Sequence, residues 1–129
     1  MYDFSKHKVL IVEDNDLYRK FLEKIMIKTF RCSVHDVRDP QEAIDWMKNN
    51  EFTVMLLDME MPKMDGYTFL RHLRENPKYE NLPVIVCTSL SSVDLVVRLV
   101  KLKISDFIEK RSDSKVITEK IYKVLKSLD

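Results

Sequence analysis

The sequence predicts an α/β domain in which a doubly wound, five-stranded parallel sheet is flanked by five helices. Two observations lead to this fold class. Short continuous apolar runs alternate along the chain with longer segments whose apolar residues recur at helical spacing. The segments between them are short, so five strands and five helices fit the 129 residues. Because parallel strands need crossover connections, this alternation indicates a sheet covered on both faces.

Five short segments are the predicted strands. Residues 8–13, 52–58 and 82–87 are largely continuous apolar runs, which is typical of strands buried on both faces. Residues 33–37 form a weaker strand candidate, and residues 104–108 are the last one. The order in which these strands lie in the sheet does not follow from the pattern alone.

The predicted helices carry an apolar stripe on one side. In residues 15–30 the stripe consists of Leu17, Phe21, Leu22, Ile25 and Met26. A second helix starts at Asp39 and Pro40, because aspartate is a typical N-cap and proline fits the first turn. The other three helices are expected over residues 66–75, 91–102 and 112–128.

Composition and charge exclude several classes of protein. Glycine occurs once, at Gly66, where average usage would give about nine. Glycine-rich phosphate loops and the G-x-S-x-G elbow each need at least two glycines, so the chain contains neither. The net charge of +1 lacks the basic excess typical of nucleic-acid binders. The length predicts one domain, residues 1–129.

The sequence shows no sign of membrane insertion or export. No apolar run approaches the about 18 residues of a membrane span, and residues 1–8 lack the apolar core of a signal peptide. Cys32 and Cys87 lie far apart and form no metal-type pair. We therefore expect a reducing, cytoplasmic setting and no membrane partner.

Reactive side chains stand at the ends of four of the predicted strands. The first strand ends in Glu13 and Asp14, the third in Asp58, the fourth in Thr88 and Ser89, and the fifth in Glu109 and Lys110. Taken singly, an acidic residue at such a place is more often a helix cap or a solvated turn. Together they are expected to meet at one edge, because ligands of open parallel sheets bind at the carboxyl ends of the strands.

This cluster favours phosphoryl chemistry assisted by Mg²⁺. Clustered carboxylates repel one another unless a cation intervenes, and Mg²⁺ usually binds one or two carboxylates together with a phosphate. Asp58 is the candidate nucleophile, since carboxylates form aspartyl-phosphates. Lys110 and the cation would neutralise the phosphoryl oxygens, and the Thr88 hydroxyl would donate to one of them.

Residues 58–66, Asp-Met-Glu-Met-Pro-Lys-Met-Asp-Gly, resemble the D-x-x-M-P-x-M-D-G segment of receiver domains from two-component response regulators. Glu13 with Asp14, Thr88 with Ser89, and Lys110 also fall at that family's places, so the resemblance covers essentially the whole chain. It implies a flavodoxin-like fold with strand order 2-1-3-4-5, as in a chemotaxis-type or isolated receiver.

The resemblance also implies the metal site and the phosphoryl donor. Asp58 would accept a phosphoryl group from the phosphohistidine of a sensor histidine kinase or phosphotransfer protein. Asp14, Asp58 and the backbone carbonyl of Glu60 would bind Mg²⁺ directly, and Glu13 would act through water. Such a protein is a switch with limited self-phosphorylation and autodephosphorylation rather than an enzyme.

The same resemblance implies how the switch works. Phosphorylation adds about −1.5 to −2 charges and gives Thr88 and Lys110 a new partner. Thr88 would move toward the phosphoryl group, and Phe107, three residues before the lysine, would be the aromatic residue that packs inward. The readout face would lie within residues 91–128 and would contact a downstream target protein or a second copy of the chain.

Two departures from the family pattern affect the backbone. Arg111 follows Lys110, where the family commonly has a proline joined by a cis bond. We expect a strained cis bond there or, as the alternative, a trans bond with a rerouted loop. Lys103 and Ile104 replace the usual Gly-Ala, so the end of the preceding helix is expected to fray or change shape.

A third departure concerns the residues two positions beyond Asp58 and Thr88, which are Glu60 and Leu90. In the family these positions tune the lifetime of the phosphoryl group. Glu60 places another negative charge near the site, so an unusual lifetime is a hypothesis.

The predicted helix 91–102 has an unusually wide apolar face. At about 100° per residue its apolar side chains cover an arc of about 220°, whereas a core-facing stripe needs about 100°. The excess is expected to be a docking or dimer face. The alternative is that neighbouring loops or the last helix cover it.

Two other functions stay open. An aspartate-nucleophile, Mg²⁺-dependent phosphatase or phosphotransferase usually has a second acid two residues after the nucleophile, where Glu60 stands, but the lid insertion of that class is missing. A protein-interaction module of the same fold would leave Asp58 unphosphorylated. The chain itself leaves no room for a separate DNA-binding domain, so we expect no direct contact with nucleic acid.

Overall fold

The computed structural model describes residues 2–89 and 92–129, and it confirms the predicted fold class. One parallel sheet has the strand order β2-β1-β3-β4-β5, as the resemblance implied. Its strands are β1 (Lys8–Val12), β2 (Ser33–Val37), β3 (Val54–Asp58), β4 (Val84–Thr88) and β5 (Asp106–Glu109). The helices are α1 (Asp16–Lys24), the π-helical turn η1 (Ile25–Thr29), α2 (Pro40–Asn49), α3 (Gly66–Glu75), α4 (Val93–Lys101) and α5 (Ser114–Ser127).

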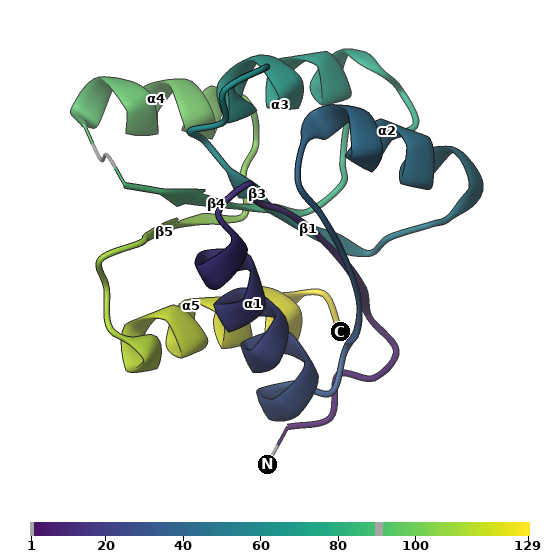
Figure 1. Ribbon diagram of the computed structural model, residues 1–129, viewed down its shortest axis with the longest axis vertical. Coiled ribbons are helices and arrows are strands. Elements are labelled where there is room, and N and C mark those ends of the chain that lie inside the picture. Colours follow the sequence, from purple (N-terminus) through teal and green to yellow (C-terminus); the bar gives the residue numbers. More distant parts are fainter. Residues whose placement is uncertain (1, 90–91) are drawn as a thin grey trace.

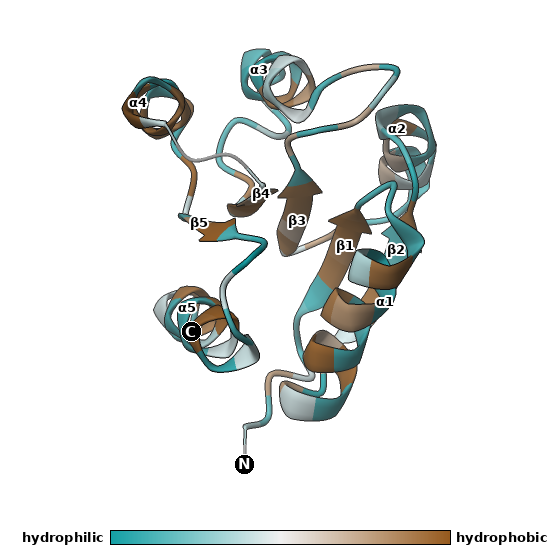
Figure 2. Cartoon of the chain, turned by 60° about the vertical axis from the view of Figure 1, so that its left-hand side comes forward, coloured by the Kyte–Doolittle hydropathy of each residue, from teal (hydrophilic) through white to brown (hydrophobic). Residues whose placement is uncertain are grey.

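The helices cover both faces of the sheet. Helices α1 and α5 lie on one face, and α2, α3 and α4 lie on the other (Figure 1). Alternate strand residues point to opposite faces of the sheet. Val9 and Ile11 therefore join the core cluster that includes residues of α1 and α5, while Leu10 and Val12 join the cluster that includes residues of α2, α3 and α4. All residues of β3 and β4 are buried, which explains their apolar sequences, and β3 is brown along its length in Figure 2.

Each α-helix begins at a side chain that caps its first turn. Asp39 accepts a hydrogen bond from the Glu42 N–H at 2.9 Å, as its position before Pro40 predicted. The other caps are Asn15, Asp65, Ser92 and Asp113. These short polar residues satisfy backbone N–H groups that have no partner within the helix, so they fix where each helix starts.

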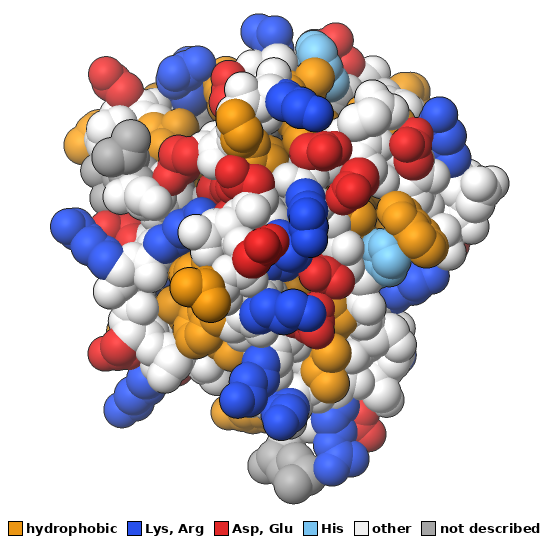
Figure 3. All heavy atoms as spheres, in the orientation of Figure 1, with side chains coloured by type: hydrophobic (Ala, Val, Ile, Leu, Met, Phe, Trp, Pro, Cys, Tyr) orange, Lys and Arg blue, Asp and Glu red, His pale blue; other side chains and the backbone are white. Residues whose placement is uncertain are grey.

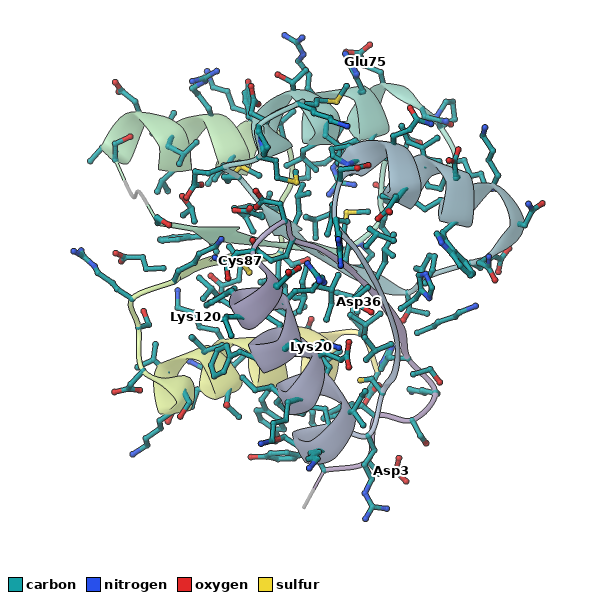
Figure 4. All side chains as sticks on the ribbon, in the orientation of Figure 1. Asp3, Lys20, Asp36, Glu75, Cys87 and Lys120 are labelled. Carbon is teal, nitrogen blue, oxygen red and sulfur yellow. The ribbon has the colours of Figure 1, made fainter. Side chains whose placement is uncertain are left out.

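The apolar stripe of α1 was predicted wrongly at its first turn. Leu17 is 84% exposed, whereas Arg19 is 5% exposed. The Arg19 guanidinium is buried because it donates to the Glu13 carbonyl at 3.0 Å and to the Asp36 and Asp16 carboxylates. Asp36 lies beside α1 in Figure 4. Because of these polar partners, Arg19 and not Leu17 faces the protein in the first turn of α1, contrary to the orientation that the apolar spacing suggests.

The end of α4 is ordered without the usual glycine. Lys103 adopts a left-handed φ of 58°, a conformation that favours glycine. Its N–H donates to the Val100 carbonyl at 3.0 Å. Arg74 of α3 donates to the carbonyls of Leu102 at 2.7 Å and Lys103 at 3.3 Å. The helix end is therefore reshaped and capped from a neighbouring helix rather than frayed.

The expected cis bond between Lys110 and Arg111 does not occur, since the described part of the chain contains no cis peptide bond. Without proline the cis form costs about 2.5–4 kcal/mol. The trans chain is held by ordinary contacts instead, because the Lys110 N–H donates to Thr88 and the Ser112 N–H donates to Glu109, both at 2.9 Å. The chain therefore adopts the trans bond that was the alternative expectation.

None of the helices in residues 2–89 and 92–129 has the length and apolar character of a membrane span. On the face drawn in Figure 3, acidic and basic side chains are interspersed. Both cysteines, Cys32 and Cys87, are buried free thiols.

Candidate phosphoryl and metal site

The candidate site lies where β1, β3, β4 and β5 end, and Gly66 shapes the loop that follows Asp58. The Gly66 N–H donates to the Met59 carbonyl at 3.0 Å, which brings the start of α3 back onto the end of β3. A Cβ on Gly66 would collide with the Asp58 carbonyl oxygen and lie 2.8 Å from Met59 Cα. A close backbone approach, rather than a left-handed φ, therefore requires this glycine.

Three predicted carboxylates converge at this edge. One oxygen from each of Glu13, Asp14 and Asp58 lies within 4.8 Å of the others. Glu13 and Asp58 are each 1% exposed, whereas Asp14 is exposed to solvent. Hard oxygen donors at this spacing, with one side open to solvent, suit a divalent cation that keeps several waters.

Lys110 reaches the same carboxylates from the loop after β5. Its Nζ lies 2.7 Å from Glu13 Oε1 and 3.0 Å from Asp58 Oδ1. Asp58 Oδ1 also accepts the Glu60 N–H at 3.0 Å. The other oxygen, Asp58 Oδ2, is buried and accepts no hydrogen bond from any described residue. This orphaned oxygen is available to a cation or to a new covalent bond, so the residues fit a bound Mg²⁺.

Burial dominates the electrostatics of Asp58. It raises the pKa of the Asp58 carboxyl to about 8, and the nearby Glu13 charge adds to the rise. The Glu60 N–H and Lys110 act in the opposite direction and hold the pKa lower than burial alone would. Asp58 faces Cys87 in the β3–β4 register, and that buried cysteine is labelled in Figure 4. A divalent cation would remove much of this penalty on the charged carboxylate.

Thr88 and Ser89 complete the site from the end of β4, and a carboxylate faces both. The Thr88 hydroxyl donates to Glu60 Oε2 at 2.9 Å, and the Ser89 N–H donates to Glu60 Oε1 at 2.6 Å. Thr88 is 1% exposed. Sequence reasoning singled out Thr88, Ser89 and Glu60 but not their contact. Leu90, the other departure after Thr88, lies outside the described residues.

Phe107 and Glu109 lie on β5, paired with Val86 and Thr88 of β4. Phe107 is partly buried against the core cluster under α3 and α4. Lys120 of α5 places its Nζ 4.5 Å from the centre of the Phe107 ring. Phe107 therefore contacts both the core cluster and a cation of α5.

Two residues of the site were missed by sequence reasoning. Arg19 holds the Glu13 carbonyl, so it supports the loop that carries the acidic pair. Tyr18 places its ring 4.9 Å from Lys110 Nζ, and burial raises the pKa of its hydroxyl. Tyr18 follows Asp14 by four residues and Arg19 follows Asp16 by three, and these spacings are the signal that could have indicated them.

The wide apolar face of α4 is exposed. Val93, Val97 and Val100 are 80%, 49% and 63% exposed, whereas Leu99 faces the core and is fully buried. The described neighbouring loops and α5 leave these three valines uncovered, which goes against the alternative of a covered face.

Comparison with known proteins agrees with this architecture. The chain is 28% identical over 119 residues to a chemotaxis protein CheY homolog from Campylobacter jejuni, with 92% of each chain covered. It is 41% identical over 85 residues to a protein-glutamate methylesterase/protein-glutamine glutaminase from Chromobacterium violaceum, and 35% identical over 85 residues to a gliding motility regulatory protein from Myxococcus xanthus. The matches cover 65% and 66% of this chain but only 23% and 11% of those longer proteins.

Solved structures show the same fold. The signal receiver domain of a signal transduction histidine kinase from Syntrophus aciditrophicus matches with a TM-score of 0.82 and 30% identity, covering 95% of this chain and 92% of that one. The model of the response regulator receiver domain family matches residues 9–122. That match extends from the first strand to the last helix and includes every strand end of the site, so the chain belongs to the response regulator receiver domain family.

Proposed function

We propose that this chain is a phosphorylation-dependent switch in which Asp58 accepts a phosphoryl group from a phosphohistidine of a sensor histidine kinase or phosphotransfer protein. The observation that carries the proposal is the buried Asp58 carboxylate, whose Oδ2 lacks a hydrogen bond from the described residues while Lys110 holds Oδ1. A receiver domain that uses this site would signal by changing charge at one buried position.

Receiver domains bind Mg²⁺ at an acidic pocket, and the residues here fit that ion. In the proposed site Asp14, Asp58 and the Glu60 backbone carbonyl bind Mg²⁺ directly, and Glu13 acts through water. When bound, the ion supplies positive charge to the phosphoryl oxygens and lowers repulsion between the carboxylates.

The chain's own residues then perform the transfer. A bond forms between an Asp58 carboxylate oxygen and phosphorus as the phosphorus–nitrogen bond of the donor breaks, and the electron pair leaves with the imidazole. Lys110 neutralises a phosphoryl oxygen and the Thr88 hydroxyl donates to another. Lys110 lies close enough because Glu13 and Asp58 already hold its ammonium group.

The proposed readout follows from the loops after β4 and β5. A phosphoryl group on Asp58 gives Thr88 and Lys110 a new anionic partner, so their loops shift. Phe107 then packs inward between α4 and α5. The changed surface, which includes the exposed valines of α4, contacts a downstream target protein or a second copy of the chain.

We also infer that residues 1–129 form a single receiver domain, because the five strands and their helices extend over nearly all of them. The two free, buried cysteines suit a reducing compartment such as the cytoplasm.

Incubation with Mg²⁺ and a small phosphodonor tests the proposal. Intact mass should rise by one phosphoryl group in the parent and stay unchanged in Asp58→Asn, which keeps the size of the side chain but not its charge. Rapid turnover of many phosphate esters would identify a phosphatase instead. A chain that never reacts at Asp58, with or without Mg²⁺, would identify an interaction module.

A further inference from the structure

We propose that Glu60 is an internal competitor of the phosphoryl group, whose carboxylate occupies the Thr88 hydroxyl and the Ser89 N–H in the unphosphorylated protein. The proposal rests on the proposed function and adds its regulation. One carboxylate accepts both hydrogen bonds, at 2.9 Å from Thr88 and 2.6 Å from Ser89. These are the donors at the end of β4 that a phosphoryl group on Asp58 would need.

The backbone of Glu60 explains how its side chain reaches them. Its N–H donates to Asp58 Oδ1 at 3.0 Å, so the backbone stays tied to the acceptor residue. The side chain then bridges from the loop after β3 to the end of β4. Any group attached to Asp58 is added beside this bridge.

The two anions cannot both hold these donors. A carboxylate and a phosphoryl group both carry negative charge, and the phosphoryl group adds about −1.5 to −2 charges. Thr88 has one hydroxyl proton and Ser89 has one N–H to donate. Phosphorylation must therefore displace the Glu60 carboxylate before Thr88 and Ser89 can bind the phosphoryl oxygens.

A cleft beside the bridge offers the displaced carboxylate a place. It has a volume of about 310 Å³ and lies between α3 and α4, with Glu60 and Thr88 in its walls. Arg71 and Arg98 also line it, and the Arg98 guanidinium lies 4.0 Å from the centre of the Tyr67 ring. On displacement the Glu60 side chain would leave β4 and turn toward these cationic groups on α3 and α4, with Asp65 as the other acidic residue in the cleft walls. This movement would couple Asp58 to α4.

Removal of the carboxylate should make the site easier to fill. Beryllofluoride with Mg²⁺ serves as the probe, because it binds an aspartate as a phosphoryl group would without being turned over. We expect Glu60→Ala to lower the half-saturating concentration about tenfold, since two charge-assisted hydrogen bonds no longer have to be broken. Glu60→Gln, which keeps the shape but not the charge, should lower it by a smaller factor.

The matched control is Asp94→Asn, which removes one negative charge from the exposed first turn of α4. It should leave the half-saturating concentration within about twofold of the parent, because an exposed charge is screened by solvent. Asp58→Asn should not bind the probe. If Asp58→Asn binds the probe as well as the parent does, or if neither the parent nor any variant binds it, the proposed function fails and the competition fails with it.

A second measurement examines the contact without any phosphoryl analogue. Hydrogen exchange of the Ser89 amide should be about tenfold faster in Glu60→Ala than in the parent, because that N–H loses its acceptor. Faster exchange together with tighter probe binding supports the competition. If the parent binds the probe and Glu60→Ala binds it equally or more weakly, the competition is wrong while the proposed function stands. Unchanged Ser89 exchange would also overturn it.

Discussion

Replacement of Gly66 by alanine should both destabilise the fold and disturb the candidate metal site. A Cβ at this position would collide with the Asp58 carbonyl oxygen and lie 2.8 Å from Met59 Cα. Both atoms belong to the backbone at the end of β3, so neither can swing aside as the end of a side chain could. Overpacking of this kind costs about 1–3 kcal/mol. The least costly relief is a shift of α3 against β3, which moves Asp58 relative to Glu13 and Asp14.

The sign of the effect is what makes this substitution informative. Gly66 is the first residue of α3, and within a helix alanine is more favourable than glycine by about 1 kcal/mol. Propensity alone therefore predicts a gain in stability, whereas the close approach predicts a loss. Ser114→Ala is the matched control, because Ser114 is the exposed first residue of α5 and follows an aspartate N-cap as Gly66 does.

Urea unfolding followed by circular dichroism measures the first effect, and titration with Mg²⁺ measures the second. We expect Gly66→Ala to lower the free energy of unfolding by about 1–3 kcal/mol and to weaken Mg²⁺ binding. Ser114→Ala should change neither by more than a few tenths of a kcal/mol. If Gly66→Ala is as stable as the parent and binds Mg²⁺ equally well, the steric reasoning is refuted.

Three further substitutions test the electrostatics of the site and the end of α4. Burial raises the pKa of Asp58 to about 8, above its ordinary 3.8, so the stability contributed by this carboxyl is present below the ordinary pKa and is lost as the pH rises toward 8. Without Mg²⁺, Asp58→Asn should be more stable than the parent by about 1–3 kcal/mol at pH 8, and urea unfolding should show the difference shrinking toward pH 4; a pH-independent difference would contradict this. Arg74→Ala should lower the free energy of unfolding by about 2–3 kcal/mol in thermal denaturation, because carbonyls of Tyr79, Leu102 and Lys103 lose their donor, whereas the exposed Arg71→Ala should have little effect. Lys103→Gly should raise the free energy of unfolding by about 1 kcal/mol, since glycine adopts a φ of 58° without strain. The control Lys101→Gly, within α4, should lower the free energy of unfolding by a similar amount. Equal changes in the two variants would argue against strain at Lys103.

The parts of the fold that could be predicted are those set by nearby residues. Strands β3 and β4 are buried on both faces, so their sequences are apolar up to the final Asp58 and Thr88 and are easy to recognise. Asp39 caps α2 by accepting a hydrogen bond from the N–H of Glu42, three residues later in the chain, and such local hydrogen bonds leave a sequence signature. The strand order followed only from the resemblance, since apolar runs do not say which strand pairs with which.

The parts that could not be predicted depend on contacts between distant segments. Leu17 fits the stripe of α1 by spacing, but Asp36, 17 residues from Arg19, draws the arginine into the buried position instead. Lys103 keeps a left-handed conformation partly because Arg74, 28 residues from Leu102, caps the helix end. The residues next to Lys103 and Arg19 in the sequence do not indicate that Arg74 and Asp36 would be these partners.

The candidate site combines both kinds of information. The carboxylates and Lys110 were predictable because each stands at or just beyond the end of a strand, where the fold itself brings them together. Their pairing was not, and the pairing determines the resting state. Glu13 and Asp58 hold Lys110, and Glu60 bridges Thr88 and Ser89, so the donors that would bind a phosphoryl group are each held by a carboxylate of this chain. Under the proposed function, an incoming phosphoryl group would have to exchange partners with these carboxylates rather than enter a set of free donors. Its binding would therefore rearrange the loops after β4 and β5, which is the change that a switch needs.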